Sequence, residues 1–191
     1  MKKNHYLTKI IPYIKNNKNK FIKDAILAHK RFNFVYGSET NKSPTQLFRY
    51  YNLTNLTFGS IYFFNLYKEL QKIIRKFSNH NKPLWYQSWL NFHSSNEVLD
   101  WHKHHHSCFH GYISIDPKDT ETEFENYKIK NEVGKVYIGS SGLKHRVNLL
   151  KPYEGKRITI AFDVFTEKEV KIMYKKYGNI DVNTGLTPIY L

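Results

Sequence analysis

Histidines gathered in one short run are the residues with the clearest chemistry in this sequence. The segment Asp100-Trp-His-Lys-His-His-His106 holds four imidazoles within five residues, and His145 follows far downstream. Imidazole nitrogen suits both Zn²⁺ and Fe²⁺, so the residue types predict a metal site and leave the two metals open. The competing interpretation is a polar loop, with His145 as an ordinary hydrogen-bonded imidazole.

The spacing of these histidines matches a site built on strands. Side chains two residues apart share one face of a strand, so His102 and His104 can point into the same site. His145 leads into a later apolar segment, from which it can supply a third nitrogen. Three ligands on one side of an ion leave its remaining positions open to other molecules.

A second chemical signal is Arg157, which begins the segment Arg-Ile-Thr-Ile-Ala-Phe. Arg157 and Thr159 share a strand face by the same period of two. An arginine that points into a barrel requires an anion, and its planar guanidinium matches a carboxylate in a bidentate manner. The alternative is a structural ion pair with an acidic residue elsewhere.

The elements expected to position these residues are short strands in the second half of the chain. Apolar alternation predicts strands over 84–92, 110–116, 135–140, 147–150 and 157–165. No helical pattern separates them, which favours an antiparallel barrel or jelly roll over parallel βαβ units.

Helices are expected on both sides of this core. Apolar residues at helical spacing predict helices over 21–32 and 61–77 that back a sheet, and Ser43-Pro44-Thr45 is typical of a helix start. Thr166 is expected to cap a helix that runs to about residue 177. We therefore expect one domain over 1–191, with helical support in 1–84, the strand core in 85–165, and a C-terminal helix and tail in 166–191.

Composition limits the classes of protein to consider. The chain has 191 residues, 40% of them hydrophobic, and 30 basic against 16 acidic residues give a formal charge of +14. The lysines are scattered, so we attribute most of this charge to composition, while an anionic partner stays open. A single cysteine excludes a disulfide framework, and no apolar run is long enough to span a membrane. A cytoplasmic protein is expected.

Taken together, these motifs resemble the iron(II)- and 2-oxoglutarate-dependent oxygenases, the superfamily that includes prolyl hydroxylases. The match is closest to a bacterial and phage group with a His-x-His motif, and it spans roughly residues 85–165. The segments that carry it, in order, are Trp89-Leu-Asn91, His102-Lys-His104 with Gly111-Tyr-Ile, Glu132-Val-Gly-Lys-Val-Tyr-Ile with His145-Arg-Val, and Arg157-Ile-Thr159.

The resemblance implies an α+β fold whose core is a double-stranded β-helix, of the jelly-roll or cupin-like kind, with N-terminal helices outside and a short C-terminal helix. It implies a hydroxylase that uses Fe(II), 2-oxoglutarate and O₂ and releases succinate and CO₂. The implied iron ligands are His102, His104 and His145. Most of the superfamily has an acid in place of His104, and Asp100 is the obvious substitute.

The same resemblance implies a pocket for 2-oxoglutarate. Arg157, helped by Thr159, would hold the distal carboxylate of the cosubstrate. The further pocket residues implied are Asn91, Tyr112 and Ser114. The primary substrate is not identified, and the basic charge leaves room for an anionic macromolecule.

Two other functions remain open at this stage. One is a cupin-like metalloenzyme with three histidines and no 2-oxoglutarate, in which Arg157 would contact an internal acid. The other is a basic, non-enzymatic nucleic-acid-binding module, which predicts salt-sensitive binding that survives loss of His102 and His145.

Overall fold

The computed structural model describes residues 6–36, 52–57, 59–97, 99–177 and 185–190. Its helices are α1 (Pro12–Asn16), α2 (Lys18–Tyr36), α3 (Leu53–Thr57), α4 (Ile61–Ser78) and α5 (Glu167–Tyr177). Its strands are β1 (Tyr6–Ile10), β2 (Leu84–His93), β3 (Phe109–Asp116), β4 (Thr120–Phe124), β5 (Lys128–Lys130), β6 (Lys135–Ser140), β7 (His145–Leu149), β8 (Arg157–Thr166) and β9 (Thr187–Ile189).

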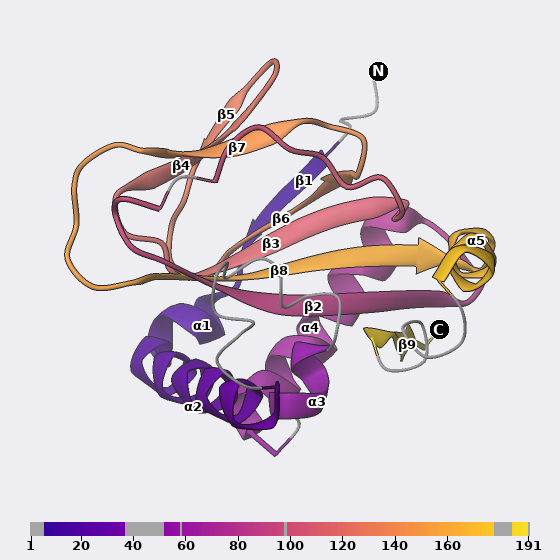
Figure 1. Ribbon diagram of the computed structural model, residues 1–191. Helices are drawn as coiled ribbons and strands as arrows, with labels where there is room; N and C mark the ends of the chain where they lie inside the picture. The colour runs from indigo at the N-terminus through magenta and orange to yellow at the C-terminus, as the bar shows by residue number, and fades with distance from the viewer. Residues whose placement is uncertain (1–5, 37–51, 58, 98, 178–184, 191) are drawn as a thin grey trace.

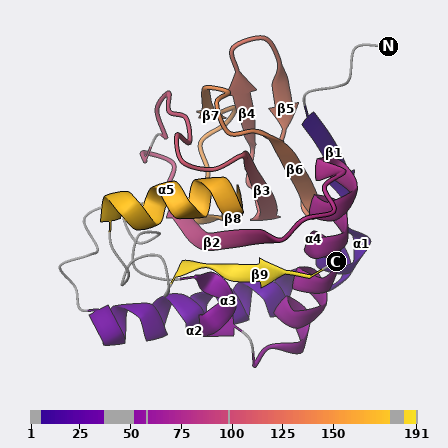
Figure 2. The same ribbon diagram turned by 90° about the vertical axis from the view of Figure 1, so that its right-hand side faces the viewer.

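The strands form a large and a small antiparallel sheet. The large sheet has the order β1-β6-β3-β8-β2-β9, and the small sheet has the order β5-β4-β7. Helices α1 to α4 lie against one side of the large sheet, and the small sheet lies on its other side (Figure 1). The view at right angles shows the same three layers (Figure 2). Any site between the two sheets is therefore on the side away from the helices.

Strict alternation along β8 assigns its side chains to these two sides. Ile158, Ile160 and Phe162 belong to the hydrophobic core that the helices share, and each is at most 3% exposed. Arg157 and Thr159 point the opposite way, toward the small sheet, because successive side chains in a strand alternate. The central strand thus carries an apolar face for the core and a polar face for a site.

Helices α2 and α4 form because each has an apolar stripe that the large sheet can bury. Phe21 of α2 packs against Phe63 of α4, with ring centroids 5.3 Å apart, and both rings are fully buried. The hydroxyl of Ser60 accepts a hydrogen bond from the N–H of Phe63 and caps α4, and Asn79 ends it in the left-handed region at φ 47°. The helices expected over 21–32 and 61–77 are confirmed.

The expected mixture of helices and antiparallel strands is confirmed, as are all five predicted strands and α5. The finer expectation of a double-stranded β-helix core stays a prediction, since among the described residues the strands form two separate sheets and no closed barrel. An isolated bridge between His102 and His145 links the small sheet to the segment before β3. Strands β1, β4, β5 and β9 were not expected, and β1 adds a strand to the helical N-terminal part.

Two remaining expectations concern the rest of the chain. The predicted helix start at Ser43-Pro44-Thr45 lies outside the described residues. Among the helices that the structure describes, none combines the length and the apolar character needed to cross a membrane.

Candidate metal centre and anion pocket

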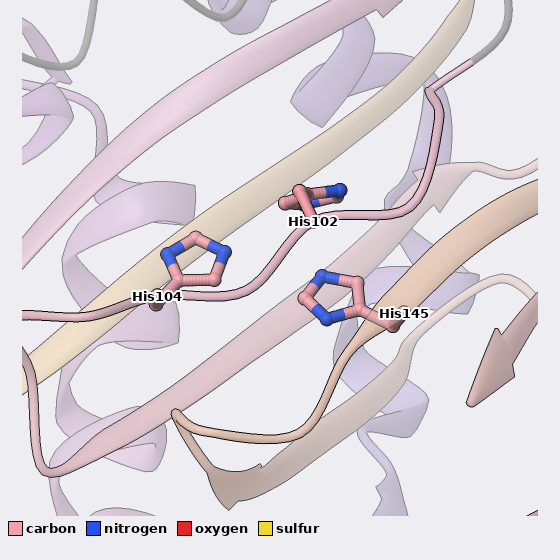
Figure 3. Close-up of side chains that lie close together, drawn as sticks. All are labelled: His102, His104 and His145. Atoms are coloured by element: carbon pink, nitrogen blue, oxygen red, sulfur yellow. The ribbon is translucent and has the colours of Figure 1, made fainter. Parts of the chain in front are cut away.

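Three histidines come together between the two sheets. His102 and His104 lie on the extended segment before β3, and His145 is the first residue of β7 (Figure 3). One ring nitrogen from each lies within 4.8 Å of the other two. The backbone of His102 exchanges hydrogen bonds of 3.0 and 2.9 Å with that of His145, which fixes the two segments side by side. The structure therefore brings together the three ligands expected from the sequence.

In each of the three histidines, an oxygen atom lies within hydrogen-bond distance of the Nδ1 atom and orients the ring. The Nδ1 atom of His102 lies 2.7 Å from the carbonyl oxygen of Asp100, and that of His145 lies 3.2 Å from the carbonyl oxygen of Leu143. The Nδ1 atom of His104 lies 3.0 Å from Oδ2 of Asp163. An Nδ1–H that donates to oxygen leaves Nε2 with a free lone pair, the form in which histidine binds metals.

Asp163 of β8 also holds a fourth histidine. Its Oδ1 lies 2.9 Å from Nδ1 of His110, whose ring stacks on that of His104 with centroids 3.6 Å apart. Burial by itself would raise the pKa of the Asp163 carboxyl, but the interactions with His104 and then His110 outweigh burial and keep this pKa below its ordinary value. Asp163 thus places a negative charge directly behind His104.

Burial favours the neutral form of three of these imidazoles. It lowers the pKa of His145 to about 2 and that of His110 to about 4, and it also lowers the pKa of His102. Neutral imidazole is the metal-binding form, so His102 and His145 are ready to bind a cation near neutral pH. Nε2 of His104 is buried and has no hydrogen-bond partner among the described residues, so its lone pair is available to a metal ion.

Arg157 is buried in the same region, and none of the described acidic residues pairs with it. Its side chain is 4% exposed, and its Nη1 lies 3.2 Å from Nδ1 of His93. Its Nε is buried without a hydrogen-bond partner, and no ion pair among the described residues includes it. Burial lowers the pKa of Arg157 to about 10, so it keeps its charge near neutral pH. The guanidinium therefore has a charge and at least one donor to offer to an anion.

The neighbouring pair Asn91 and Thr159 extends this polar surface. They are direct partners on β2 and β8, and Nδ2 of Asn91 lies 3.4 Å from Oγ1 of Thr159. Because Thr159 accepts from the amide, its own hydroxyl proton can be donated elsewhere. Oδ1 of Asn91 is buried, and no described residue forms a hydrogen bond with it.

One cavity of about 350 Å³ joins the histidines to the arginine. The expected site residues that line it are Asn91, Asp100, His102, His104, Tyr112, His145, Arg157 and Thr159. Ser114 is fully buried on β3 but does not line the cavity. The carboxylate of Asp100 accepts a hydrogen bond from the N–H of Trp101. Possible ligand atoms lie within 4.8 Å of one another in two clusters, that of His102, His104 and His145 and that of His104, His110 and Asp163, and Asp100 belongs to neither. The structure thus brings Asp163, and not Asp100, next to the histidines.

Sequence reasoning assigned no role to Asp163, His110 or His93. A signal for Asp163 exists, because it lies on the same face of β8 as Arg157 and Thr159 by the period of two. His93 lies two residues after Asn91 and therefore shares its face of β2. The contact between His104 and Asp163 joins residues 59 positions apart, which no local pattern indicates.

No protein-family model and no curated protein sequence matches the chain. The structure does match solved proteins. SnoN, a non-haem α-ketoglutarate-dependent epimerase from nogalamycin biosynthesis, matches with a TM-score of 0.53 and 8% identity, over 84% of this chain and 76% of SnoN.

The chain shares the fold of this epimerase. The resemblance to the iron(II)- and 2-oxoglutarate-dependent superfamily is confirmed at the level of the fold. A weaker match is an oxidoreductase of the 2OG-Fe(II) oxygenase family from Burkholderia pseudomallei, with a TM-score of 0.44 and 11% identity over 59% of this chain and 55% of that protein. Another is the nickel complex of the non-haem monooxygenase ThoJ, with a TM-score of 0.42 and 10% identity over 51% of this chain and 49% of ThoJ. The matched part covers about half of each of these two proteins.

Replacing Asp163 by asparagine should weaken metal binding about 10- to 100-fold, because an amide cannot accept from both His104 and His110. Titration with Fe(II) or Zn(II) under anaerobic conditions measures the change. Asp116→Asn is a matched control, since the Asp116 side chain is 13% exposed against 12% for Asp163 and pairs with Lys18 instead. Equal affinity for wild type and Asp163→Asn would contradict the assigned orientation of His104.

Acid should destabilise the metal-free protein. Burial lowers the pKa of His93 and of His110 to about 4, whereas the unfolded chain binds these protons near pH 6.5. The unfolded state thus gains protons first, and stability falls as the pH decreases from about 6.5 to 4. Each group contributes at most about 1.4 kcal/mol per pH unit. Urea unfolding at pH 7 and pH 5 measures this, and a free energy of unfolding that does not fall would contradict neutral buried imidazoles.

Proposed function

We propose that this protein is a non-haem Fe(II)- and 2-oxoglutarate-dependent dioxygenase that hydroxylates a substrate and releases succinate and CO₂. The observation that carries the proposal is that Arg157, which is buried and has no acidic partner among the described residues, lines one cavity with His102, His104 and His145. A metal centre and an anion-binding group that meet in one pocket match a cosubstrate with a metal-chelating end and a distant carboxylate.

The residues present fit a ferrous ion. His102, His104 and His145 each have an oxygen beside Nδ1, so each can turn Nε2 toward a shared ion. A triad of imidazoles has no negative charge of its own. Asp163 compensates for this, because a carboxylate hydrogen-bonded to a ligating histidine raises the basicity of that ligand.

The fit to 2-oxoglutarate rests on the other end of the cavity. Arg157 offers its unpaired Nε–H and Thr159 its hydroxyl proton to the distal carboxylate. Between them and the histidines, Ala161 lines the cavity with a side chain too small to fill it. When bound, iron and 2-oxoglutarate supply the activation of O₂ that is coupled to decarboxylation of the keto acid.

Residues of the chain form the walls of the cavity around this site. Trp89 packs beside His104, with ring centroids 5.9 Å apart, and forms an apolar wall of the cavity. Such walls exclude bulk water from the open side of the metal. The formal charge of +14 favours an anionic substrate, since it raises the local concentration of anions.

A second candidate is a three-histidine, cupin-like metalloenzyme that does not use 2-oxoglutarate. The observation that favours it is the cluster of His102, His104 and His145, which contains no carboxylate. The observation against it is that Arg157 forms no ion pair with an internal acid among the described residues. A nucleic-acid-binding module explains neither the oriented histidines nor the buried arginine.

Thermal unfolding with Mn(II), which replaces Fe(II) without oxidation in air, separates the two enzymes. The dioxygenase should gain stability from Mn(II) and gain further from 2-oxoglutarate only when Mn(II) is present. A ligand at 100 times its dissociation constant adds about 2.7 kcal/mol. Stabilisation by Mn(II) with no further effect of saturating 2-oxoglutarate would favour the cupin-like enzyme.

A further inference from the structure

His93 forms a buried side-chain hydrogen bond with Arg157. The two residues are direct partners at the ends of β2 and β8, and both side chains point to the cavity side of the large sheet. Nη1 of Arg157 lies 3.2 Å from Nδ1 of His93, and the two side chains are 4% and 5% exposed. A guanidinium can only donate, so Nδ1 must be the acceptor in this hydrogen bond.

A histidine that accepts from arginine is neutral. Burial and, after it, the charge of Arg157 lower the pKa of His93 to about 4. The guanidinium is therefore oriented by a group that carries no charge. A carboxylate at this position would orient it equally well but would neutralise it.

The other groups around His93 leave this charge uncompensated. The hydroxyl of Tyr153 donates to the carbonyl oxygen of His93 over 3.1 Å. Glu97 and Arg157 both line a small neighbouring cavity of about 30 Å³, but Glu97 pairs with Lys156 over 3.4 Å. No described acid forms an ion pair with Arg157 from either side.

We propose that His93 is a positioning residue that orients Arg157 without neutralising it, and that it thereby makes the pocket select a keto acid with a second, distal carboxylate. This inference rests on the proposed function, because it concerns the cosubstrate of that site. It assigns the selectivity to the pair of His93 and Arg157, and not to the arginine alone.

The test compares two keto acids on the Fe(II)-loaded protein without oxygen. 2-Oxoglutarate and 2-oxovalerate share the chelating end and the five-carbon chain, but only the first has a distal carboxylate. Wild type should bind 2-oxoglutarate more tightly by about 100-fold, from charge-assisted hydrogen bonds to Arg157. His93→Asp should lower this ratio of dissociation constants at least tenfold, while binding of 2-oxovalerate stays within a few fold.

A second pair of variants keeps the test decisive if the aspartate variant fails to fold. His93→Asn retains a neutral acceptor near the position of Nδ1 and should keep the wild-type ratio. His93→Leu has no acceptor for Arg157 and should lower the ratio. A role of His93 in folding alone would change both affinities together and leave their ratio unaltered.

The failure of this inference differs from the failure of the proposed function. If wild type prefers 2-oxoglutarate and the ratio is the same in His93→Asp or His93→Leu, the role of His93 is overturned and the proposed function stands. If metal-loaded wild type binds neither keto acid, the proposed function is overturned and the inference with it.

Discussion

Replacing Arg157 by methionine should weaken binding of 2-oxoglutarate to the metal-loaded protein by about 100-fold or more. A hydrogen bond to a charged group contributes about 1.5–3 kcal/mol, and a bidentate carboxylate receives two of them. Methionine keeps most of the side-chain volume and removes the donors and the charge. Calorimetric titration of 2-oxoglutarate into the Mn(II)-loaded proteins measures the difference.

The Arg157→Met variant should lose affinity for 2-oxoglutarate without losing stability. Without 2-oxoglutarate, Arg157→Met should be as stable as wild type or more stable, because burial of an uncompensated charge is unfavourable. Removing one partner of a buried ion pair would instead cost about 3–5 kcal/mol. A loss of that size in urea unfolding would show that Arg157 has a structural acidic partner and would contradict its assignment to a ligand.

Replacing His145 by alanine should lower the affinity for Fe(II) by more than about 100-fold. Loss of a group that only orients a ligand costs about 10- to 100-fold, and loss of the ligand itself should cost more. His145 is 4% exposed and belongs to the cluster of three nitrogens. Anaerobic equilibrium dialysis with Fe(II) measures the affinity.

The matched control for His145 is His105, an exposed histidine of the same run that belongs to neither cluster of ligand atoms. His105→Ala should bind Fe(II) with wild-type affinity. If the two variants lose affinity equally, the metal is held by the histidine run as a flexible segment and not by the site between the sheets.

The parts of the fold that could be predicted are those with a local pattern. Period two identified β2 and β8, and helical spacing identified α2 and α4, because each element buries one continuous apolar face. Strand β1 could not be predicted, since none of its residues is fully buried. Strand β5 has three residues, of which only Ile129 is buried, so it offers no repeat to detect.

The residues of the site also fall into those that a local pattern predicts and those that it does not. The spacing of His102 and His104 predicted that they share a site. The place of Arg157 on a strand predicted that its side chain points to the same side as that of Thr159. The faces on which Asp163 and His93 lie could be predicted from the alternation along β8 and β2. Their partners could not be predicted, because these depend on how β8 pairs with β2 and β3 in the sheet. Asp100 is close to His102 in sequence, yet its backbone carbonyl, and not its carboxylate, contacts that ring.

The proposed function requires one cavity that can hold Fe(II) at the histidines and the distal carboxylate of 2-oxoglutarate at Arg157. The most direct measurement is the visible difference spectrum of the protein with Fe(II) and 2-oxoglutarate in the absence of oxygen. Chelation of ferrous iron by the keto acid gives a weak charge-transfer band, which we predict for wild type and not for His145→Ala. A wild-type protein that is fully loaded with iron and shows no band at saturating 2-oxoglutarate would contradict the proposed function.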